Sequence, residues 1–250
     1  MQYSTQELLI NTIATLIDPA NTIAVGVLSP IPGSAALLSS QLSKERKKKV
    51  YILGSNNPKF RTSHGVEIFD LAGQGRIDTF FLSGGQIDGT ANINLTGIGP
   101  YPKQNNRWSG AFGSAYLYFL IPQVILFREK HQRDVLVESV DLISAPGSSP
   151  KNTFRTGGPR HLVTNLCVFD FNREEEQFYL RSVHPKHTLE EVLDNTGFNF
   201  KYSSTPSTTA IPSEYQLQIL REEVSKDIGE IYPSFAAKIW PSDHRVNKDL

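Results

Sequence analysis

The chain has 250 residues, with 25 Lys+Arg, 25 Asp+Glu and one cysteine, so its formal net charge at pH 7 is zero. A chain of this length can bury a sizeable core without disulfides or a structural metal. Zero net charge speaks against the broad basic field that non-specific binding to nucleic acid or to an anionic membrane requires. The single cysteine, Cys167, excludes an intrachain disulfide and a cysteine-rich zinc site, and its apolar neighbours predict a buried thiol.

The sequence shows neither a targeting segment nor a membrane span. Residues 1–7 lack the basic start and apolar run of a signal peptide. No stretch approaches the roughly 20 apolar residues that a membrane helix needs. We therefore expect a cytoplasmic protein without a membrane or nucleic-acid partner.

Capping signals and short apolar runs define the predicted elements. Ser4 and Glu7 have the spacing of a capping box, and Thr188 and Glu191 repeat that spacing. The basic run 44–49 is predicted to end the second helix, where its cations complement the helix dipole and stay solvated. In chain order we expect a helix over 4–18, a strand over 23–28, a helix over 34–44, a strand over 50–53, a helix over 66–71, strands over 79–82, 124–127, 140–143, 166–169 and 177–180, and helices over 188–193 and 214–224.

This alternation of strands and helices predicts an α/β protein whose mainly parallel sheet is flanked by helices. One domain is expected to span residues 1–250. Within it, the Ser-, Thr- and Pro-rich stretch 201–213 reads as an irregular surface segment, and 226–250 reads as a tail.

Two glycine clusters, at 83–99 and 109–115, occupy the middle of the chain. Glycine lets backbone amides approach a ligand closely and adopt left-handed conformations, as a cradle for a phosphate or an oxyanion requires. Neither cluster has the spacing of a phosphate loop or a dinucleotide site. The six histidines form no zinc-binding pair, so no metal is expected, and no Gly-x-Ser-x-Gly motif is present. Residue patterns alone therefore name no reaction.

Five blocks, in order along the chain, resemble the beta subunit of family I CoA-transferases, especially the glutaconate CoA-transferase type. The first block contains Ser83-Gly84-Gly85-Gln86-Ile87-Asp88, and the second begins Arg107-Trp108. All five blocks lie at 83–94, 107–114, 131–147, 163–170 and 193–198.

The resemblance implies an open α/β sandwich that assembles with a homologous alpha subunit as a heteromer. It also implies an acyl-CoA substrate bound where the subunits meet, with coenzyme A entering only as part of that substrate and no permanently bound cofactor. In the family's transferase mechanism, a glutamate of the beta subunit attacks the thioester and forms an acyl anhydride. Glycine-loop amides stabilise the oxyanion.

The sequence departs from the family pattern at this nucleophile. The glutamate follows the second strand in the family, whereas Leu53 or Gly54 occupies its position here. Neither side chain can attack a thioester. Relatives that lack the glutamate resemble ring-opening CoA-ester hydrolases or decarboxylases of the glutaconyl-CoA type, with catalytic groups from the alpha subunit.

The resemblance nominates pocket residues, each with a structural alternative. Ser55 and Asn56 would line the pocket and donate to a thioester oxygen. Arg107 would bind a substrate carboxylate or a CoA phosphate, or instead pair with an acid at the subunit interface. The remaining candidates would orient an acyl carbonyl or pantetheine amide, or simply shape turns, and are Gly84, Gly85, Gln86, Asn92, Asn94, Gly110 and Gly113.

The resulting hypothesis is a beta-like subunit of a heteromeric CoA-transferase-family enzyme that acts on an acyl-CoA thioester without a glutamyl anhydride on this chain. The alternatives are a CoA-ester hydrolase or decarboxylase, and a scaffolding subunit whose catalytic groups all lie in the partner. A sugar-phosphate isomerase or effector domain is a further reading, because the same fold class hosts those functions.

Overall fold

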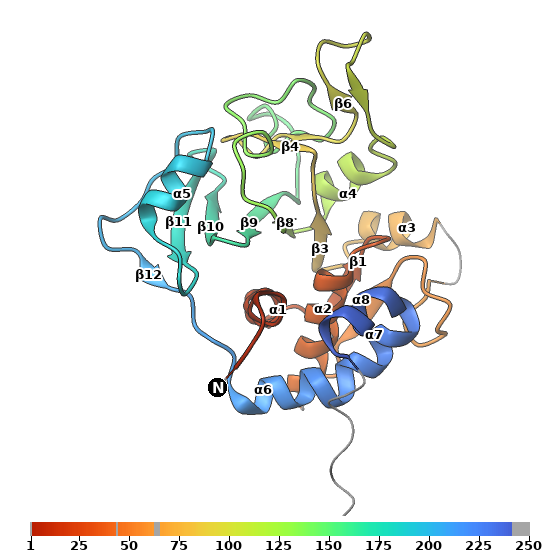
Figure 1. The fold of residues 1–250 in the computed structure, drawn as a ribbon. Helices are drawn as coiled ribbons and strands as arrows, with labels where there is room; N and C mark the ends of the chain where they lie inside the picture. Colours follow the sequence, from red (N-terminus) through yellow and green to blue (C-terminus); the bar gives the residue numbers. More distant parts are fainter. Residues whose placement is uncertain (1, 44, 63–65, 242–250) are drawn as a thin grey trace, which may run out of the picture. The chain divides into compact units, whose positions relative to one another are not determined.

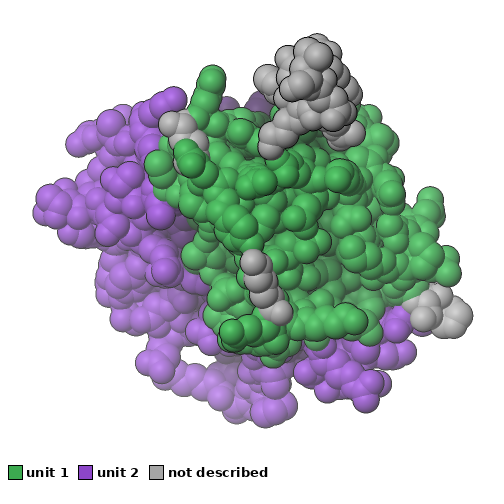
Figure 2. Space-filling model, turned by 90° about the horizontal axis from the view of Figure 1, so that it is seen from below, with its two compact units in different colours: residues 1–65, 211–250 green, residues 66–210 purple. Residues whose placement is uncertain are grey.

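The computed structural model describes residues 2–43, 45–62 and 66–241, and the chain forms two compact units (Figure 2). Unit 1 contains residues 1–65 and 211–250, and unit 2 contains residues 66–210. Each unit has its own hydrogen-bonded strands and its own helices. Part of the predicted tail, from residue 242 onward, lies outside the described residues.

Unit 1 combines two parallel strands with helices from both ends of the chain (Figure 1). The strands β1 (Thr22–Val25) and β2 (Lys49–Ile52) place Val25 opposite Ile52. The helices are α1 (Thr5–Leu16), α2 (Pro30–Leu42), α6 (Glu214–Ile219), the π-helical turn η1 (Leu220–Val224), α7 (Ser225–Ile231) and α8 (Pro233–Ile239). The central helix α2 packs against α1, both strands, α6, η1 and α7.

The predicted capping box at the start of α1 is confirmed, and it anchors a buried carboxylate. Glu7 N–H donates to Ser4 Oγ, and Ser4 N–H donates to Glu7 Oε2 at 2.9 Å. Arg221 donates to both carboxylate oxygens of Glu7, at 2.7 and 2.9 Å. Burial alone would raise the pKa of Glu7, but these hydrogen bonds outweigh it and keep the pKa below its ordinary value. The carboxylate therefore ties α1 to the C-terminal helices of unit 1.

Unit 2 is built on a mixed sheet with the strand order β12-β11-β10-β9-β8-β3. The strands β3, β8 and β9 run parallel, β10 is antiparallel to both β9 and β11, and β12 is parallel to β11. Two short hairpins pair β4 with β5 and β6 with β7. The bounds are α3 (Glu67–Gly73), β3 (Thr79–Leu82), β4 (Gln86–Ile87), β5 (Ile93–Asn94), β6 (Gly97–Ile98), β7 (Asn106–Arg107), α4 (Ser114–Leu120), β8 (Gln123–Arg128), β9 (Pro159–Thr164), β10 (Cys167–Asn172), β11 (Gln177–Val183), α5 (Leu189–Asn195) and β12 (Ser207–Thr208).

Apart from the two short hairpins, most of the strand pairs in the two units are parallel, and helices accompany them, so the predicted α/β class with a mainly parallel sheet is confirmed. Among the described residues, no helix is both long and apolar enough to cross a lipid bilayer.

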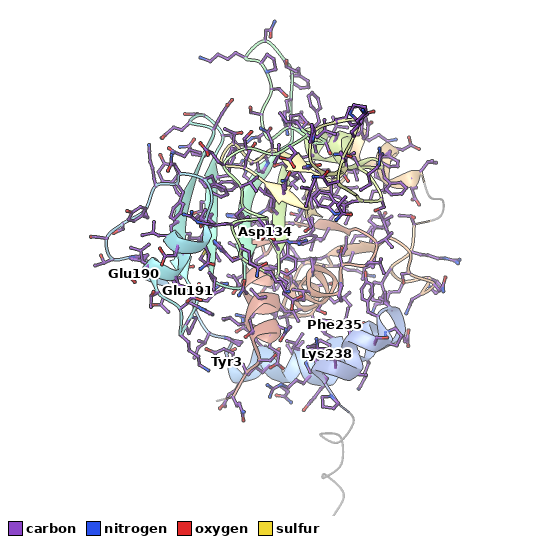
Figure 3. The ribbon with its side chains drawn as sticks, turned by 45° about the horizontal axis from the view of Figure 1, so that its top comes forward. Tyr3, Asp134, Glu190, Glu191, Phe235 and Lys238 are labelled. Carbon is purple, nitrogen blue, oxygen red and sulfur yellow. The ribbon has the colours of Figure 1, made fainter. Side chains whose placement is uncertain are left out.

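The start of α5 is also as predicted. Glu191 N–H donates to Thr188 Oγ1 at 3.2 Å, which caps the helix. Glu190 and Glu191 stand in the first turn (Figure 3), where negative charge complements the positive end of the helix dipole. His187 Nδ1 lies 2.8 Å from Glu191 Oε2, so this histidine belongs to the same helix start.

The predicted strand over 140–143 is wrong. This stretch has no ladder partner, because its polar groups bond to side chains and loops instead. Asp141 N–H donates to Gln86 Oε1 at 3.0 Å, and Asp141 Oδ2 accepts from Gly99 N–H at 2.7 Å. Only isolated bridges flank the stretch, at Leu136 and Ala145. Only Val140 of this stretch is buried, whereas Ile143 is exposed, so the short apolar run forms a loop and not a buried strand.

Besides the two-residue strands β4, β5, β6, β7 and β12, two longer elements of unit 2 were not expected from the sequence. β9 begins with Pro159, which is tolerated at the first residue of a strand but resembles a loop signal in the sequence. α4 is rich in aromatic residues and starts beside Gly113, without a side-chain cap. In unit 1, the described part of 226–250 contains most of α7 and all of α8.

The basic run 44–49 differs from expectation at Lys48. α2 already ends at Leu42, and Lys48 is buried instead of solvated. Its ammonium group donates to Ser39 Oγ at 2.8 Å and to the backbone oxygens of Ile17 and Asp18, and it pairs with the Asp18 carboxylate at 3.3 Å. Burial lowers the pKa of Lys48, and the Asp18 charge partly opposes this shift. Lys48 therefore joins the end of α1 to α2.

We expect Lys48→Met to lower the free energy of unfolding by about 2–4 kcal/mol, because Ser39 and the two carbonyl groups lose a charged donor. Urea unfolding monitored by circular dichroism measures this change. The matched control is Lys47→Met, which changes an exposed neighbour and should stay within about 0.5 kcal/mol of the wild type. Equal effects of both substitutions would contradict a buried role for Lys48.

Candidate functional site

The turn after β2 is where the family resemblance places the nucleophile. Leu53 N–H still donates to Val25 O at 3.0 Å, which extends the pairing with β1 by one residue. Gly54 follows with φ +81° and is exposed, and a Cβ placed there would lie 3.6 Å from Val27 Cγ1. The end of β2 therefore presents a half-buried leucine and a glycine, and no carboxylate.

The rest of this loop is held by its own polar groups and by α7. Ser55 is buried, and its Oγ accepts from Asn57 N–H at 3.1 Å. Asn57 Nδ2 donates to Glu230 Oε2 at 2.9 Å, and Lys59 pairs with Asp227 at 3.3 Å. Asn56 is exposed. No local sequence signal could have found these two carboxylates of α7, because the fold brings them to the loop from the C-terminal segment.

In unit 2, Asp88 organises the glycine-rich segment as a turn residue. Its Oδ1 accepts from Thr90 N–H at 3.0 Å, from Thr90 Oγ1 at 2.8 Å and from Asn92 N–H at 3.0 Å. Asn92 Nδ2 donates to Asp88 Oδ2, and Asn92 Oδ1 accepts from Gly147 N–H. The polar atoms of Asn92 are thus committed to contacts within unit 2.

Gln86 and Asn94 form a second internal pair. Asn94 Nδ2 donates to Gln86 Oε1 and to Gly97 O, both at 2.7 Å. Asn94 Oδ1 accepts from Thr96 N–H at 3.0 Å. Both side chains are buried. Their carbonyl oxygens hold the β4–β5 hairpin and the turn that follows it.

Three of the candidate glycines are sites of close side-chain packing. A Cβ on Gly84 would lie 2.5 Å from Ile93 Cγ2. A Cβ on Gly85 would lie 2.0 Å from the Trp108 ring, and Gly85 N–H already donates to Asn94 O at 2.9 Å. A Cβ on Gly113 would lie 1.9 Å from the ring of Phe69, a residue that the sequence did not nominate for the pocket. The missing Cβ atoms make room for these side chains.

Gly110 and Arg107 lie on an exposed part of unit 2. Gly110 has φ +97° with no heavy atom within 4 Å of an added Cβ. Arg107 is exposed on β7, whose partner β6 begins at Gly97. Phe112 is 93% exposed with φ +46°. This loop therefore presents an open glycine and an aromatic ring to the surroundings.

Arg128 was missed from the sequence, where it reads as the end of an apolar run. It is the last residue of β8 and lies opposite Thr164 of β9. Its Nε is buried, and no hydrogen bond or ion pair with another described residue satisfies the side chain. A buried donor without an acceptor costs about 1–3 kcal/mol.

A buried polar cluster follows β8 and β9. His131 contacts Thr164 Oγ1 through Nδ1 at 2.9 Å and Thr196 Oγ1 through Nε2 at 2.8 Å. His184 contacts Thr164 O through Nε2 at 2.8 Å. Cys167 is buried as predicted, its Sγ is 3.7 Å from His131 Nδ1, and burial raises its pKa. Among the described residues, no cluster of three or more His, Cys, Asp or Glu side chains could hold a metal ion.

Sequence comparison agrees with this fold and this set of glycine-rich turns. The coenzyme A transferase family model matches residues 8–195, which is most of the chain. The chain belongs to that family.

Three curated relatives match part of the chain. It is 31% identical over 153 residues to the beta-type subunit of the 3-oxoadipate CoA-transferase of Pseudomonas knackmussii, covering 59% of this chain and 58% of the relative. It is 28% identical over 151 residues to the beta-type subunit of the glutaconate CoA-transferase of Acidaminococcus fermentans, covering 58% and 56%. It is 29% identical over 160 residues to the cholesterol ring-cleaving hydrolase IpdB subunit of Rhodococcus jostii, covering 62% of each. The matched region is thus less than two thirds of each relative.

Two solved structures share the fold at low sequence identity. The Rhodococcus jostii RHA1 IpdAB structure has a TM-score of 0.77 and 23% identity, covering 89% of this chain and 94% of that chain. The decarboxylase AibA/AibB has a TM-score of 0.72 and 20% identity, covering 96% and 99%.

We expect Gly85→Ala to destabilise the protein by about 2 kcal/mol or more, because its methyl group would overlap the Trp108 ring. Chemical unfolding measures this loss. In a Trp108→Ala background the same substitution should cost clearly less, since the obstructing ring is gone. Gly229→Ala, in α7 with its nearest atom at 3.9 Å, is the tolerated control. An undiminished cost in the Trp108→Ala background would contradict the packing role.

The two buried histidines predict a loss of stability in acid. Burial lowers the pKa of His131 and of His184 from 6.5 to about 4. The unfolded chain therefore takes up these protons near pH 6.5, whereas the folded protein resists them until about pH 4. Their contribution to stability is complete above pH 6.5 and is lost as the pH falls toward 4, by up to about 3 kcal/mol each.

Urea unfolding between pH 7.5 and pH 4.5 tests this dependence. Replacing His131 with Gln should reduce the slope of unfolding free energy against pH by about 1.4 kcal/mol per pH unit below pH 6.5. His184→Gln is the matched variant and should give a similar reduction. An unchanged slope in both variants would show that these imidazoles do not titrate as proposed.

Proposed function

We propose that this chain is the beta-type subunit of a two-component CoA-transferase-family enzyme that acts on an acyl-CoA thioester. The reaction proceeds without a glutamyl anhydride on this chain. Coenzyme A enters as part of the substrate, with no permanently bound cofactor. Because acyl-CoA thioesters are intracellular metabolites, we also infer a cytoplasmic location.

The observation that carries this proposal is the backbone and side chains at the end of β2. Gly54 lies at φ +81° and Leu53 is half-buried, at the two positions where alignment with the family could place the glutamate. Glu230 and Asp227, which approach this loop, bond to Asn57 and Lys59. These two carboxylates are therefore engaged in holding the loop.

The polar groups left for the substrate are few in number. Asn56 is exposed in the loop after β2, so its amide can donate to a thioester oxygen. Ser55 is buried, and its Oγ accepts from Asn57 N–H. Gly110 offers an open backbone position in the second glycine loop. We assign the other candidates, Gly84, Gly85, Gln86, Asn92, Asn94 and Gly113, mainly to shaping the scaffold around the ligand, and Arg107 to a surface contact.

The acid or base then comes from a homologous alpha subunit, which we infer as the partner. The family contains a relative named as a subunit of a ring-cleaving hydrolase, which supports a reaction other than CoA transfer. Hydrolysis is therefore the favoured reaction type. Decarboxylation is the second candidate, because the decarboxylase AibA/AibB has the same fold.

Covalent trapping tests whether this chain carries an enzyme–CoA intermediate. The full chain, purified with its co-expressed partner, is incubated with glutaryl-CoA or pentanoyl-CoA and then treated with borohydride or hydroxylamine. We expect the mass of this chain to stay unchanged, because Leu53 and Gly54 cannot form an anhydride. Intact-mass spectrometry measures the result.

The glutaconate CoA-transferase of Acidaminococcus fermentans, treated in parallel with glutaconyl-CoA, is the positive control for trapping. A CoA-dependent mass change on the present chain would overturn the proposal. Release of free CoA by the complex, without modification of this chain, favours hydrolysis. If CoA is released equally well when this chain or its partner is left out, the chain is neither a catalytic nor a scaffolding subunit of the reaction, and the proposal fails.

A further inference from the structure

An open hollow of about 720 Å³ lies on unit 2 beside the strands β9, β10 and β11. The strands β3, β8 and β9 are parallel, and the hollow adjoins the amino end of β9. It is therefore at the opposite edge of the sheet from Gly84-Gly85, which follow the carboxyl end of β3. The six residues of β9 alone span about 20 Å. The polar residues that line the hollow are Arg160, Asp170, Asn172, Arg173, Glu174 and Tyr179.

The strand β9 is irregular at Arg160. Val124 of β8 lies opposite Pro159, and Ile125 lies opposite His161, so the pairing skips Arg160. Side chains alternate between the two faces of a regular strand, and an inserted residue breaks that alternation and redirects its side chain. Arg160 is exposed at the hollow, and no described residue forms a hydrogen bond or an ion pair with its side chain. Its guanidinium group is therefore available to a ligand.

The second arginine of the hollow, Arg173, is held in place. Its Nη2 donates to Gly157 O, and a Cβ on Gly158, whose φ is +150°, would lie 3.1 Å from the same nitrogen. Glycine at position 158 thus lets the guanidinium group lie close to the backbone. Burial lowers the pKa of Arg173, and the charge of Arg160 lowers it further. The two cations are therefore near enough to repel each other.

The carboxylates at the hollow offset these two positive charges only in part. Asp170 Oδ1 accepts from Arg181 at 3.2 Å and lies 2.7 Å from His161 Nδ1, so this carboxylate already has its own cation. Glu174 is exposed in the turn after β10, and no described residue pairs with its carboxylate. Two guanidinium groups thus face one free carboxylate, and the hollow keeps an excess of positive charge.

A phosphate monoester matches this arrangement better than a carboxylate does. It carries about 1.5–2 negative charges at pH 7 and has three strong acceptor oxygens, whereas a carboxylate carries one charge. The planar fork of arginine binds phosphate oxygens in pairs. One dianion between the two guanidinium groups would remove their repulsion. The volume of the hollow also lies within the range of small-molecule sites, roughly 300–1,000 Å³.

We propose that this hollow binds the phosphate group of a small phosphate monoester, with Arg160 and Arg173 donating to its oxygens, at a site separate from the acyl-CoA site. The inference goes beyond the proposed function and does not depend on it. Arg173 is positioned before the ligand arrives, because Gly157 holds its guanidinium group. Glu174 opposes the phosphate and lowers the affinity.

Adenosine monophosphate and adenosine test the proposal, because they differ only in the phosphate group. Isothermal titration of the full chain with its co-expressed partner, in a phosphate-free buffer of low ionic strength, should show binding of the monophosphate and none of adenosine. Inorganic phosphate should displace the monophosphate. Arg160→Gln should weaken monophosphate binding on the order of tenfold, because one charged donor group is lost.

Three further variants test the contribution of each charge. Glu174→Gln should strengthen monophosphate binding about two- to fivefold, since it removes the opposing carboxylate. Arg160→Lys keeps the charge but loses the planar fork, so its affinity should fall between those of the wild type and Arg160→Gln. Arg76→Gln, which changes an exposed arginine before β3, is the matched control and should leave the affinity unchanged. Without ligand, Arg160→Gln should melt at the wild-type temperature, since no described residue loses a partner.

A second titration separates the hollow from the acyl-CoA site. Dephospho-CoA lacks the phosphate monoester of CoA, so at saturation it should leave monophosphate binding unchanged. Loss of monophosphate binding under these conditions would place that ligand in the acyl-CoA site and overturn the proposal.

Other contrary outcomes concern the hollow alone. Equal binding of adenosine, or an affinity that neither Arg160→Gln nor Glu174→Gln changes, would overturn the phosphate role. A melting temperature lowered by several degrees in Arg160→Gln would show a structural role and would also overturn it. If adenosine monophosphate does not bind at all, the inference fails and the proposed function still stands.

Discussion

The glycine-rich segment of unit 2 depends on one constraint, which is that buried backbone groups need hydrogen-bond partners. Its hairpins are only two residues long on each side, so regular pairing satisfies few of them. Short polar side chains supply the remainder, with Asp88 accepting from two backbone amides and Asn94 bonding to three neighbouring groups. The motif at 83–94 therefore first of all satisfies the buried backbone groups of this segment. Its Asn, Asp and Gln residues are required where they stand even before any ligand is considered.

This division between residues that hold the fold and residues that are exposed explains how one fold can host several reactions. The sheet and the buried turns fix the position of the loops, while the chemistry depends on a few exposed groups at their tips. At the end of β2, where the family resemblance places the nucleophile, the backbone of Leu53 bonds to Val25, so the pairing with β1 does not depend on a carboxylate there.

The sequence could predict those elements that depend on interactions between neighbouring residues. The caps at Ser4 and Thr188 and the short apolar strands before Ser83 and Gly54 depend on neighbouring residues, and they appear where expected. The predicted strand over 140–143 was wrong because a short apolar run can also occur in a loop, and here only Val140 is buried while Ile143 is exposed. Lys48, Glu230 and the Phe69–Gly113 contact could not be foreseen, since their partners come from distant parts of each unit. For the candidate site, the sequence showed which positions are glycines. It could not show which side chains pack beside them, such as Trp108 at Gly85 and Phe69 at Gly113.

The burial of Cys167 has a practical consequence for chemical labelling. The chain contains a single thiol, and that thiol is fully enclosed and has a raised pKa. Thiolate, which is the reactive form, is therefore scarce at this position, and reagents cannot reach it. A fluorophore or spin label attached to a newly introduced surface cysteine would report from one place only. Aromatic disulfide reagents would likewise detect the sulfhydryl of free CoA without a background from this chain.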